Sequence, residues 1–527
     1  MKDTTKTLSR SFSFYSFGVI LSRLSGLARD VCLAFFFGTS VLIADFMVAF
    51  RFANLLRRVI AESPLSSSFV PTFESVKKRS LKEGFVFARD LFYTLCVLSA
   101  LLVIVLILGS SILNQFLNDF HSFKKILSLT CLMFPSLIFI CLYGLSSSFL
   151  QCEKKYFLPA SAPVFFNLTW IMWMAYAAMH KERCQALLGV GVIFSFFVQW
   201  VIVAFPIYRM FRTSMSVKEI FSFRLFHGSL SGMVKPFFMG AIGIGATQIN
   251  SLLDSVFARF ADASGPAFLW YAIRIQQVPI ALFGVAITAA LLPPLTRAIK
   301  ASDTEHFKTL FKHGYKKSFA FMSFSFFGIV SLGSLATVVI FARGEFTSIS
   351  CVSTSKCLLA YSLGLFPHAA TLILASSFYA SHDFETPMKA SLFSVLINAF
   401  ANAFLVFGLH MGAVSVALAT SLTSLFNFFY LYIVFRKKWG RDVFEITSYL
   451  KSFACGLFAA GATYLYFLCL GKEDLFFLHK AAAGKGAFVL NLAYLFSGSV
   501  IFLLFFVLME KIFKEKQVLT LFDRRDH

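Results

Sequence analysis

The chain has 527 residues, of which 58% are hydrophobic and only 14% are charged. Soluble domains carry about 25% charged residues, and apolar stretches of about twenty residues recur here, the length at which a helix spans a bilayer. These proportions argue against a soluble protein and predict an all-α, polytopic membrane protein. Basic residues exceed acidic ones by 48 to 26, a net charge of +22. No basic, aromatic-interleaved surface domain accompanies this excess, so we expect no nucleic-acid partner.

Hydropathy predicts about fourteen membrane-spanning helices. They cover residues 12–36, 42–62, 85–110, 126–150, 158–179, 186–208, 234–260, 267–295, 317–342, 358–380, 387–408, 412–435, 446–470 and 486–510. An even number of spans puts both termini on one side of the membrane. If that side is the cytoplasm, its loops carry about three times as many lysines and arginines as the opposite loops. The positive-inside rule therefore predicts cytoplasmic termini and explains most of the net charge.

Two short similarities recur along the chain at nearly the same spacing. The segment Ala44–Arg51 resembles Ala267–Arg274, 223 positions later, and Ser147–Phe149 recurs as Ser376–Phe378, 229 positions later. We interpret spans 1–6 and 7–12 as two repeats of parallel topology, followed by two further helices. The predicted domains are an N-lobe at 1–232, a C-lobe at 233–440 and a C-terminal pair at 441–527. A central cavity between two such lobes is typical of transporters.

Ionisable and amide side chains lie inside the first, second and eighth predicted spans, where a charge is costly and usually functional. They are Arg23, Arg29, Asp30, Asp45, Arg51, Asn54, Arg57, Arg58 and Arg274. Several arginines with few acids favour an anion, and guanidinium pairs bidentately with phosphate, so a phosphate or pyrophosphate head group is the predicted ligand. Residues near the helix ends have an alternative, which is to extend to the lipid headgroups. They are Arg29, Asp30, Arg57 and Arg58.

A second polar group has different chemistry. Asp254 lies in the seventh predicted span, Asn398 and Asn402 lie four apart in the eleventh, and Thr420 lies in the twelfth. One carboxylate with amide and hydroxyl oxygens suits a hard cation such as Na⁺. The alternative, left open by the sequence, is hydrogen bonding between helices of the bundle.

Other function classes are less well supported. No Walker A motif is visible, so a membrane potential or a Na⁺ or H⁺ gradient is the expected energy source. An enzyme acting on lipid-linked sugars needs paired acids or a His/Asp set at the membrane face. The only loop candidates are Glu153, His382, Asp383 and Glu385, which fit solvated loops better. A drug or cation antiporter would line its N-lobe with acids instead of arginines.

The N-terminal motifs resemble those of the MurJ (MviN) lipid II flippases. Ser22-Arg23-Leu-Ser-Gly26-Leu-Ala-Arg29-Asp30 is similar to the family's S-R-x-x-G-x-x-R-D. The segment from Ala44 to Arg58 resembles A-D-A-F-x-V-A-F-x-x-P-N-L-L-R-R, and Phe69-Val70-Pro71 resembles the F-V-P that follows. Weaker matches surround Arg274 and Pro387, and the last two helices match in position only.

The resemblance implies the multidrug/oligosaccharidyl-lipid/polysaccharide exporter fold and alternating access that carries undecaprenyl-pyrophosphate-linked peptidoglycan precursor to the outer leaflet. It implies a monomer in the bacterial inner membrane, with the last two helices forming a groove for the lipid tail. Cavity arginines carry over to Arg23, Arg29, Arg57 and Arg274, with Asp45 and Asn54 beside them. Another undecaprenyl-pyrophosphate-linked glycan remains the alternative cargo.

The sequence also departs from the family pattern. Ser63-Pro64 replaces Gly-Ala, and Ala53 replaces the proline before Asn-Leu-Leu. Gln277 stands where an acid often follows the eighth-span arginine, and Ala267 replaces a polar residue. These changes put in doubt any mechanism that requires an acid at position 277, but they leave the pyrophosphate argument unchanged.

Overall fold

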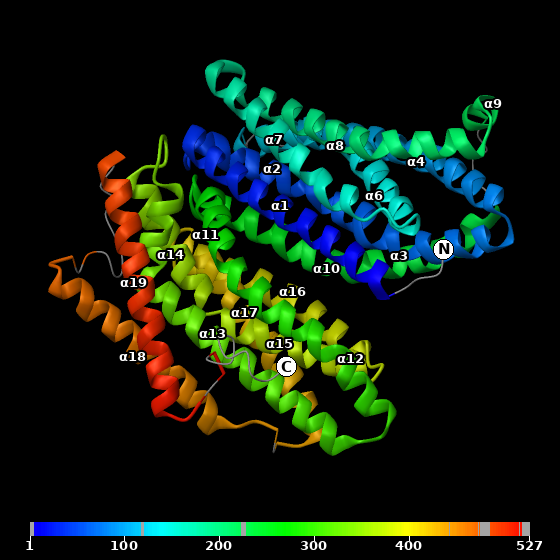
Figure 1. Cartoon of the computed structure of the whole chain (residues 1–527). Coiled ribbons are helices and arrows are strands. Elements are labelled where there is room, and N and C mark those ends of the chain that lie inside the picture. The colour runs from blue at the N-terminus through cyan, green and yellow to red at the C-terminus, as the bar shows by residue number, and fades with distance from the viewer. Residues whose placement is uncertain are drawn as a thin grey trace. The chain divides into compact units, whose positions relative to one another are not determined.

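The computed structural model describes residues 5–116, 121–222, 228–441, 443–472, 474, 485–515 and 517–518. Within these ranges all regular secondary structure is helical and no strand occurs (Figure 1). The predicted all-α class is therefore confirmed. Most of the predicted cytoplasmic tail after the last helix lies outside the described residues.

The chain divides into two compact units. Unit 1 comprises Met1–Phe37 and Val41–Leu252, and unit 2 comprises Gly38–Ser40 and Leu253–His527. The division falls inside one long helix, α10 (Ser231–Ala261), whereas the sequence places the boundary between residues 232 and 233.

Unit 1 contains ten α-helices, the last of them shared with unit 2, among its described residues. They and the short helical segments between them are α1 (Thr5–Phe37), α2 (Val41–Arg57), η1 (Arg58–Glu62), α3 (Ser63–Arg79), α4 (Leu81–Phe116), α5 (His121–Met133), α6 (Ser136–Cys152), α7 (Phe157–Met179), η2 (Lys181–Arg183), α8 (Cys184–Ser214), α9 (Val217–Phe221), η3 (Gly228–Leu230) and the first part of α10. Helix α7 packs between α1 and α8, and α6 packs on α8 (Figure 1).

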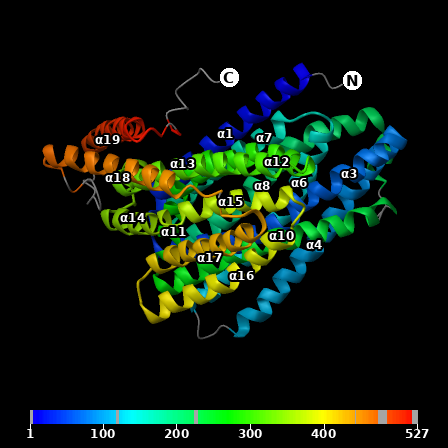
Figure 2. The same ribbon diagram turned by 90° about the horizontal axis from the view of Figure 1, so that it is seen from below.

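Unit 2 begins with the end of α10. It continues with α11 (Gly265–Pro279), η4 (Ile280–Val285), α12 (Ala286–Lys300), α13 (Thr304–Phe341), α14 (Ser348–Ser362), α15 (Leu365–Ala380), α16 (Glu385–Ala403), η5 (Phe404–Gly408), α17 (Val414–Trp439), α18 (Ile446–Cys469) and α19 (Lys485–Ile512). Helices α16 and α17 lie side by side, and α18 and α19 pack together and on α13 (Figure 2).

The two units repeat one order of elements. In unit 1 helix α2 continues through the π-helix η1 into α3, and in unit 2 helix α11 continues through the π-helix η4 into α12. The bent pair α5–α6 of unit 1, with an angle of 46°, corresponds to α14–α15 of unit 2, with an angle of 41°. The order of elements in unit 1 is therefore repeated in unit 2, and the parallel topology of the two repeats stays a prediction.

Each bend has a local cause. The turn between α5 and α6 contains Pro135, which has no N–H to continue a helix. The turn between α14 and α15 contains Gly364, where a Cβ atom would lie 2.9 Å from the Ser421 hydroxyl oxygen. Glycine is therefore needed at position 364 because helix α17 approaches the turn closely.

Nine helices of the described residues are long and apolar enough to cross a membrane, or up to eleven if each bent pair is one span. Three further predicted spans, at 12–36, 42–62 and 234–260, coincide with α1, α2 and α10, which are helical but not among these candidates. Helices α1 and α10 contain charged and amide side chains, which lower their hydropathy, and α2 has only 17 residues before η1 begins. The count of fourteen therefore stays a prediction.

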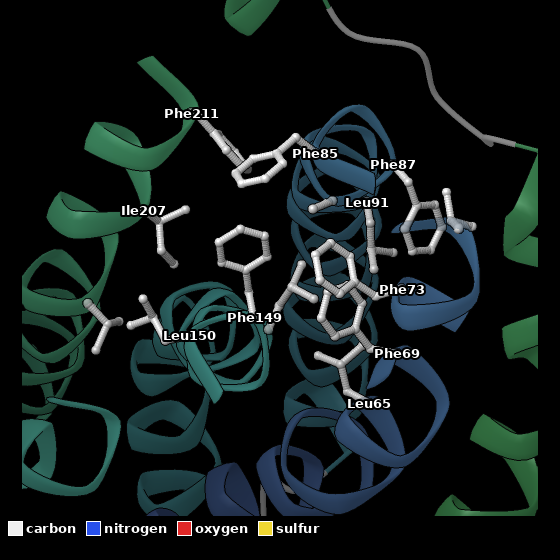
Figure 3. Packing of buried hydrophobic residues seen from close by; sticks show 14 of the residues in the cluster. Leu65, Phe69, Phe73, Phe85, Phe87, Leu91, Phe149, Leu150, Ile207 and Phe211 are labelled. Atoms are coloured by element: carbon white, nitrogen blue, oxygen red, sulfur yellow. The ribbon is translucent and has the colours of Figure 1, made fainter. Parts of the chain in front are cut away.

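Aromatic side chains fill the core at one end of unit 1. Phe69 and Phe73 of α3 stack at 5.2 Å between ring centroids, and Phe149 of α6 lies edge-on to Phe73 at 5.3 Å and to Phe85 of α4 at 5.7 Å (Figure 3). Phe211 of α8 closes the cluster. Such aromatic pairs add about 0.5–1.5 kcal/mol each beyond their buried area. The cluster therefore fixes α3, α4, α6 and α8 against one another.

Helix α9 is held against α4 by polar contacts. The Arg89 guanidinium donates to the carbonyl oxygen of Glu219, and the Tyr93 hydroxyl donates to that of Ile220 at 3.1 Å. The Lys82 ammonium lies 2.7 Å from the Glu219 carboxylate. Ser216 and Glu219 form a capping box that begins the helix.

Candidate substrate and cation sites

Arg29 of α1 lies in a polar cluster between α1 and α7. Its Nε and Nη2 atoms donate to Asp30 Oδ1 at 3.1 and 2.8 Å, and its Nη1 atom donates to Asn167 Oδ1 at 3.2 Å. The Asn167 amide in turn donates to Ser25 Oγ at 2.9 Å. The guanidinium also lies 5.3 Å from the centroid of the Trp170 ring. The side chain of Arg29 is only 13% exposed, so its orientation is well defined.

Arg23 lies two helical turns before Asp30. Unlike Arg29, it is exposed and makes no hydrogen bond or ion pair with the residues that the structure describes. Its guanidinium therefore remains available to an anion.

The polar residues of α2, together with Arg58, the first residue of η1, fall into two groups. Asp45 is buried, at 3% exposure, and the Asn54 amide donates to the backbone carbonyl of Phe50 at 2.8 Å. Arg51 and Arg58 instead reach α10. Arg51 Nη1 donates to the Ser251 carbonyl at 3.1 Å, and Arg58 Nη1 lies 3.5 Å from Gln248 Oε1.

Arg57 is the last residue of α2 before the π-helical turn η1. Its guanidinium lies 5.8 Å from the centroid of the Phe196 ring of α8. In unit 2, Arg274 of α11 lies over Trp270 at 4.5 Å. A flat guanidinium against an aromatic ring is stabilised by the electrons of the ring, which fixes the orientation of its plane.

Neighbouring glutamines of α11 point in different directions. Gln276 is buried and donates to the carbonyl of Tyr361 at 3.2 Å, which ties α11 to α14. Gln277 is exposed. Position 277 thus offers a neutral amide to its surroundings.

The predicted cation ligands come together in unit 2. Asp254 accepts hydrogen bonds from the Asn402 amide at 2.9 Å and from the Thr420 hydroxyl at 3.1 Å. The same Asn402 amide group donates to Asn398 Oδ1 at 2.9 Å. Asp254, Asn398 and Asn402 are at most 8% exposed. Helices α10, α16 and α17 therefore meet at one buried carboxylate.

An unsatisfied atom shows that this cluster fits a small cation. The Oδ1 atom of Asn402 is buried and accepts no hydrogen bond from the described residues, and such an orphaned oxygen is costly unless a donor or a cation binds it. The described residues contain no group of three or more His, Cys, Asp or Glu side chains that could hold a metal ion. Mixed carboxylate, amide and hydroxyl oxygens are the donor set of a hard ion such as Na⁺.

Two partners of the arginines have no signal of their own in the sequence motifs. Asn167 orients Arg29, and Trp170 lies beside it. The usable signal was the position of Asn167, which is the single amide side chain in the apolar span 158–179.

The profile of the family described as "Lipid II flippase MurJ" matches residues 33–483, most of the chain. This chain belongs to the MurJ lipid II flippase family. The family consists of transporters, so the chain is a multi-pass membrane transporter and not an enzyme.

Curated proteins of three bacteria are also similar to this chain over most of its length. A protein of Chlamydia trachomatis named "Probable lipid II flippase MurJ" is 27% identical over 402 residues, covering 76% of this chain and 74% of its own length. One of Vibrio cholerae with the same name is 28% identical, covering 87% and 88%. The "Lipid II flippase MurJ" of Burkholderia cenocepacia is 26% identical, covering 80% and 82%.

Solved transporter structures share the fold of this chain. A structure described as "Lipid II flippase MurJ, inward closed conformation" is 24% identical, with a TM-score of 0.73, and the match covers 94% of this chain and 98% of that one. An inward-facing MATE multidrug transporter of the MOP superfamily gives a TM-score of 0.64 at 13% identity, covering 79% and 94%. The exporter fold predicted from the resemblance is confirmed.

Proposed function

We propose that this chain moves lipid II, the undecaprenyl-pyrophosphate-linked disaccharide-peptide precursor of peptidoglycan, from the inner to the outer leaflet of the bacterial cytoplasmic membrane. The observation that carries this proposal is the family match over residues 33–483. Relatives named lipid II flippase cover most of the chain and support it. The chain acts as a monomer by alternating access, with both termini in the cytoplasm.

The arginines bind the pyrophosphate in the inward-open state. Arg23, Arg29, Arg57 and Arg274 are the proposed ligands, with Asp45, Arg51, Asn54 and Arg58 beside them. The fixed orientation of Arg29 supports this role, because a donor held in place loses little entropy when it binds phosphate. Arg23 supports the pyrophosphate role as well, because it is exposed and no described residue competes with the ligand for its guanidinium.

The energy comes from the membrane potential or from a Na⁺ or H⁺ gradient. One charge moved through 100 mV supplies about 2.3 kcal/mol. Asp254, Asn398, Asn402 and Thr420 would hold a Na⁺ ion, and the orphaned Asn402 oxygen supports this assignment. A bound ion there would neutralise the only carboxylate of the cluster and join three helices.

The substitution Arg274→Glu tests the proposal. Replacing the cation by an anion removes a charge-assisted contact and adds repulsion to the pyrophosphate, so lipid II translocation should fall by about ten- to a hundredfold. Translocation is measured in cells that depend on the variant, together with their viability. Arg297→Glu, on an exposed residue in the last turn of α12, is the matched control and should keep normal transport.

Unchanged lipid II translocation in the Arg274→Glu variant would refute the pyrophosphate assignment. Transport of another undecaprenyl-pyrophosphate-linked glycan, with none of lipid II, by the unaltered chain would refute the proposed cargo.

A further inference from the structure

A polar cavity of about 210 Å³ lies inside unit 1, between α2, α3, α6 and α8. Its polar lining consists of Arg57, Ser66, Tyr143, Ser147, Ser148, Gln151 and Gln199. The space is far larger than the roughly 10–15 Å³ that one water needs. It is smaller than the roughly 300–1,000 Å³ of a pocket that encloses a whole drug-sized ligand. The cavity therefore has room for one polar part of a larger molecule.

Gln199 of α8 gives the strongest sign that the cavity binds something. Its side chain is only 5% exposed, it lines the cavity, and it makes no hydrogen bond to any of the described residues. An amide without a protein partner needs water or a ligand to satisfy its hydrogen bonds. Because the Gln199 side chain lines the cavity, the water or ligand inside the cavity supplies these bonds.

The remaining lining groups restrict the chemistry of the ligand. The Ser66 hydroxyl likewise makes no hydrogen bond within the described part of the chain, and Ser147 receives only a long contact of 3.5 Å from Gln151. Amides and hydroxyls both donate and accept hydrogen bonds, which suits a neutral ligand rich in hydroxyl and amide groups. Arg57 is the one charged residue of the lining, and no carboxylate is present in it.

We infer that this cavity binds the sugar ring that is bonded directly to the diphosphate of the cargo. The inference rests on the proposed function, in which Arg57 binds that diphosphate. A ring attached to the phosphate lies next to it by covalent connection, and Arg57 and Gln199 line the same cavity. The ring hydroxyls and acetamido group would satisfy Gln199, Ser66 and Ser147. Arg57 then selects the charged part of the head group and Gln199 selects the sugar.

The test compares two ligands on the purified full-length protein: lipid II and undecaprenyl pyrophosphate, which has no sugar. Gln199→Leu removes the amide while nearly preserving its volume. The dissociation constant for lipid II should rise about tenfold, the loss expected when one or two hydrogen bonds disappear. The constant for undecaprenyl pyrophosphate should change by less than about twofold.

Two controls separate binding from folding. Gln199 has no hydrogen-bond partner among the described residues, so Gln199→Leu should leave the melting temperature unchanged or raise it. If Gln199 stabilised the fold instead, the substitution would lower the melting temperature. Gln185→Leu makes the same change in the same helix, outside the cavity, and should leave the affinity for both ligands unchanged. Ser66→Ala provides a second variant in the cavity and should weaken lipid II binding selectively.

An equal effect of Gln199→Leu and Ser66→Ala on both ligands, or no effect on either, would refute the sugar site and leave a water-filled cavity. That result leaves the proposed function standing as long as Arg274→Glu abolishes transport. Normal transport by Arg274→Glu refutes the proposed function itself, whatever the Gln199 variant does.

Discussion

Asn167 controls the position of the guanidinium of Arg29. It accepts from Arg29 with its oxygen and donates to Ser25 with its nitrogen, so one amide joins two positions of α1. Asp30 supplies the countercharge at 3% exposure of its side chain. The cluster satisfies a charge that would be costly inside an apolar helix pair.

Replacing Asn167 by leucine should therefore destabilise the protein. The change leaves one guanidinium N–H of Arg29 without its acceptor, which costs about 1–3 kcal/mol, while the Ser25 hydroxyl still donates to the Ser22 carbonyl. The measurement is a denaturant titration of the purified protein in detergent. Ser161→Ala in the same helix removes a hydroxyl that bonds only to the Leu158 carbonyl and serves as the control. If both variants unfold at the same denaturant concentration as the unaltered chain, Asn167 does not stabilise the Arg29 cluster.

The residues of the cation cluster could be predicted from the sequence, because a polar residue in an apolar span must face a partner. Asn398 and Asn402, four positions apart, had to share one helix face. The partners of the α2 arginines could not be predicted in this way. Gln248 and Ser251 of α10 contact Arg58 and Arg51, whereas Asp254 of the same helix contacts Asn402 and Thr420. Which face of α10 meets which helix is decided by tertiary packing.

Among the secondary-structure elements, α9 is unusual because a helix of one to two turns is held mainly by polar contacts. The ion pair with Lys82 and the capping contacts with Ser216 lower the pKa of the Glu219 carboxyl to about 2. A carboxylate with a lowered pKa stabilises the folded form above its unfolded pKa, and the contribution disappears as the pH falls through the folded pKa.

We therefore expect the docking of α9 to be independent of pH from 7 down to about 5 and to weaken between about 4 and 2. The measurement is hydrogen exchange of the amides of Lys218–Ser222, corrected for intrinsic rates. Lys82→Ala removes the largest cause of the lowered pKa, so the loss of protection should begin at a higher pH. Lys78→Ala alters an exposed lysine of α3 and should leave the profile unchanged. Identical profiles for both variants would rule out the Lys82 ion pair as the cause.

The π-helical turns and the bends were not predictable from sequence patterns. A turn of π-helix contains one extra residue, and apolar periodicity over five positions does not distinguish it from α-helix. In a regular helix, Arg51, Asn54 and Arg58 would lie on one face. Arg58 instead opens η1, and Asn54 bonds to its own backbone at Phe50.

For the molecule as a whole, a bound cation should raise the stability of the fold. A ligand that binds only the folded state stabilises it by RT ln(1 + [L]/Kd), which is about 2.7 kcal/mol at a hundredfold excess over Kd. The melting temperature should therefore rise with NaCl relative to choline chloride at equal ionic strength. Asp254→Asn should abolish the rise, since it removes the carboxylate of the cluster.

Ser424→Ala is the control for this experiment, because the Ser424 hydroxyl bonds only to the Thr420 carbonyl of its own helix. A sodium effect of equal size in the Asp254→Asn variant would place the ion elsewhere or show a general salt effect.

For the molecule as a whole, the sequence predicted the helical class, the two repeats and the family. The repeats were visible because Arg51 and Arg274 occupy matching places. The number of spans was harder to fix from hydropathy. Helices α1 and α10 carry Arg23, Arg29 and Asp254, and each charged side chain lowers the hydropathy by which a membrane span is recognised.

The π-helices η1 and η4 have a consequence for the history of the chain. They begin at Arg58 and Ile280, and 222 positions separate them, nearly the spacing of Arg51 and Arg274. A π turn is what remains when a single residue is inserted into an α-helix. Two independent insertions at equivalent places are less economical than one insertion in an ancestral half-protein that was later duplicated. The π-helical turn then arose before the duplication that produced the two lobes. It is still present in both halves, although most of their sequence identity has been lost.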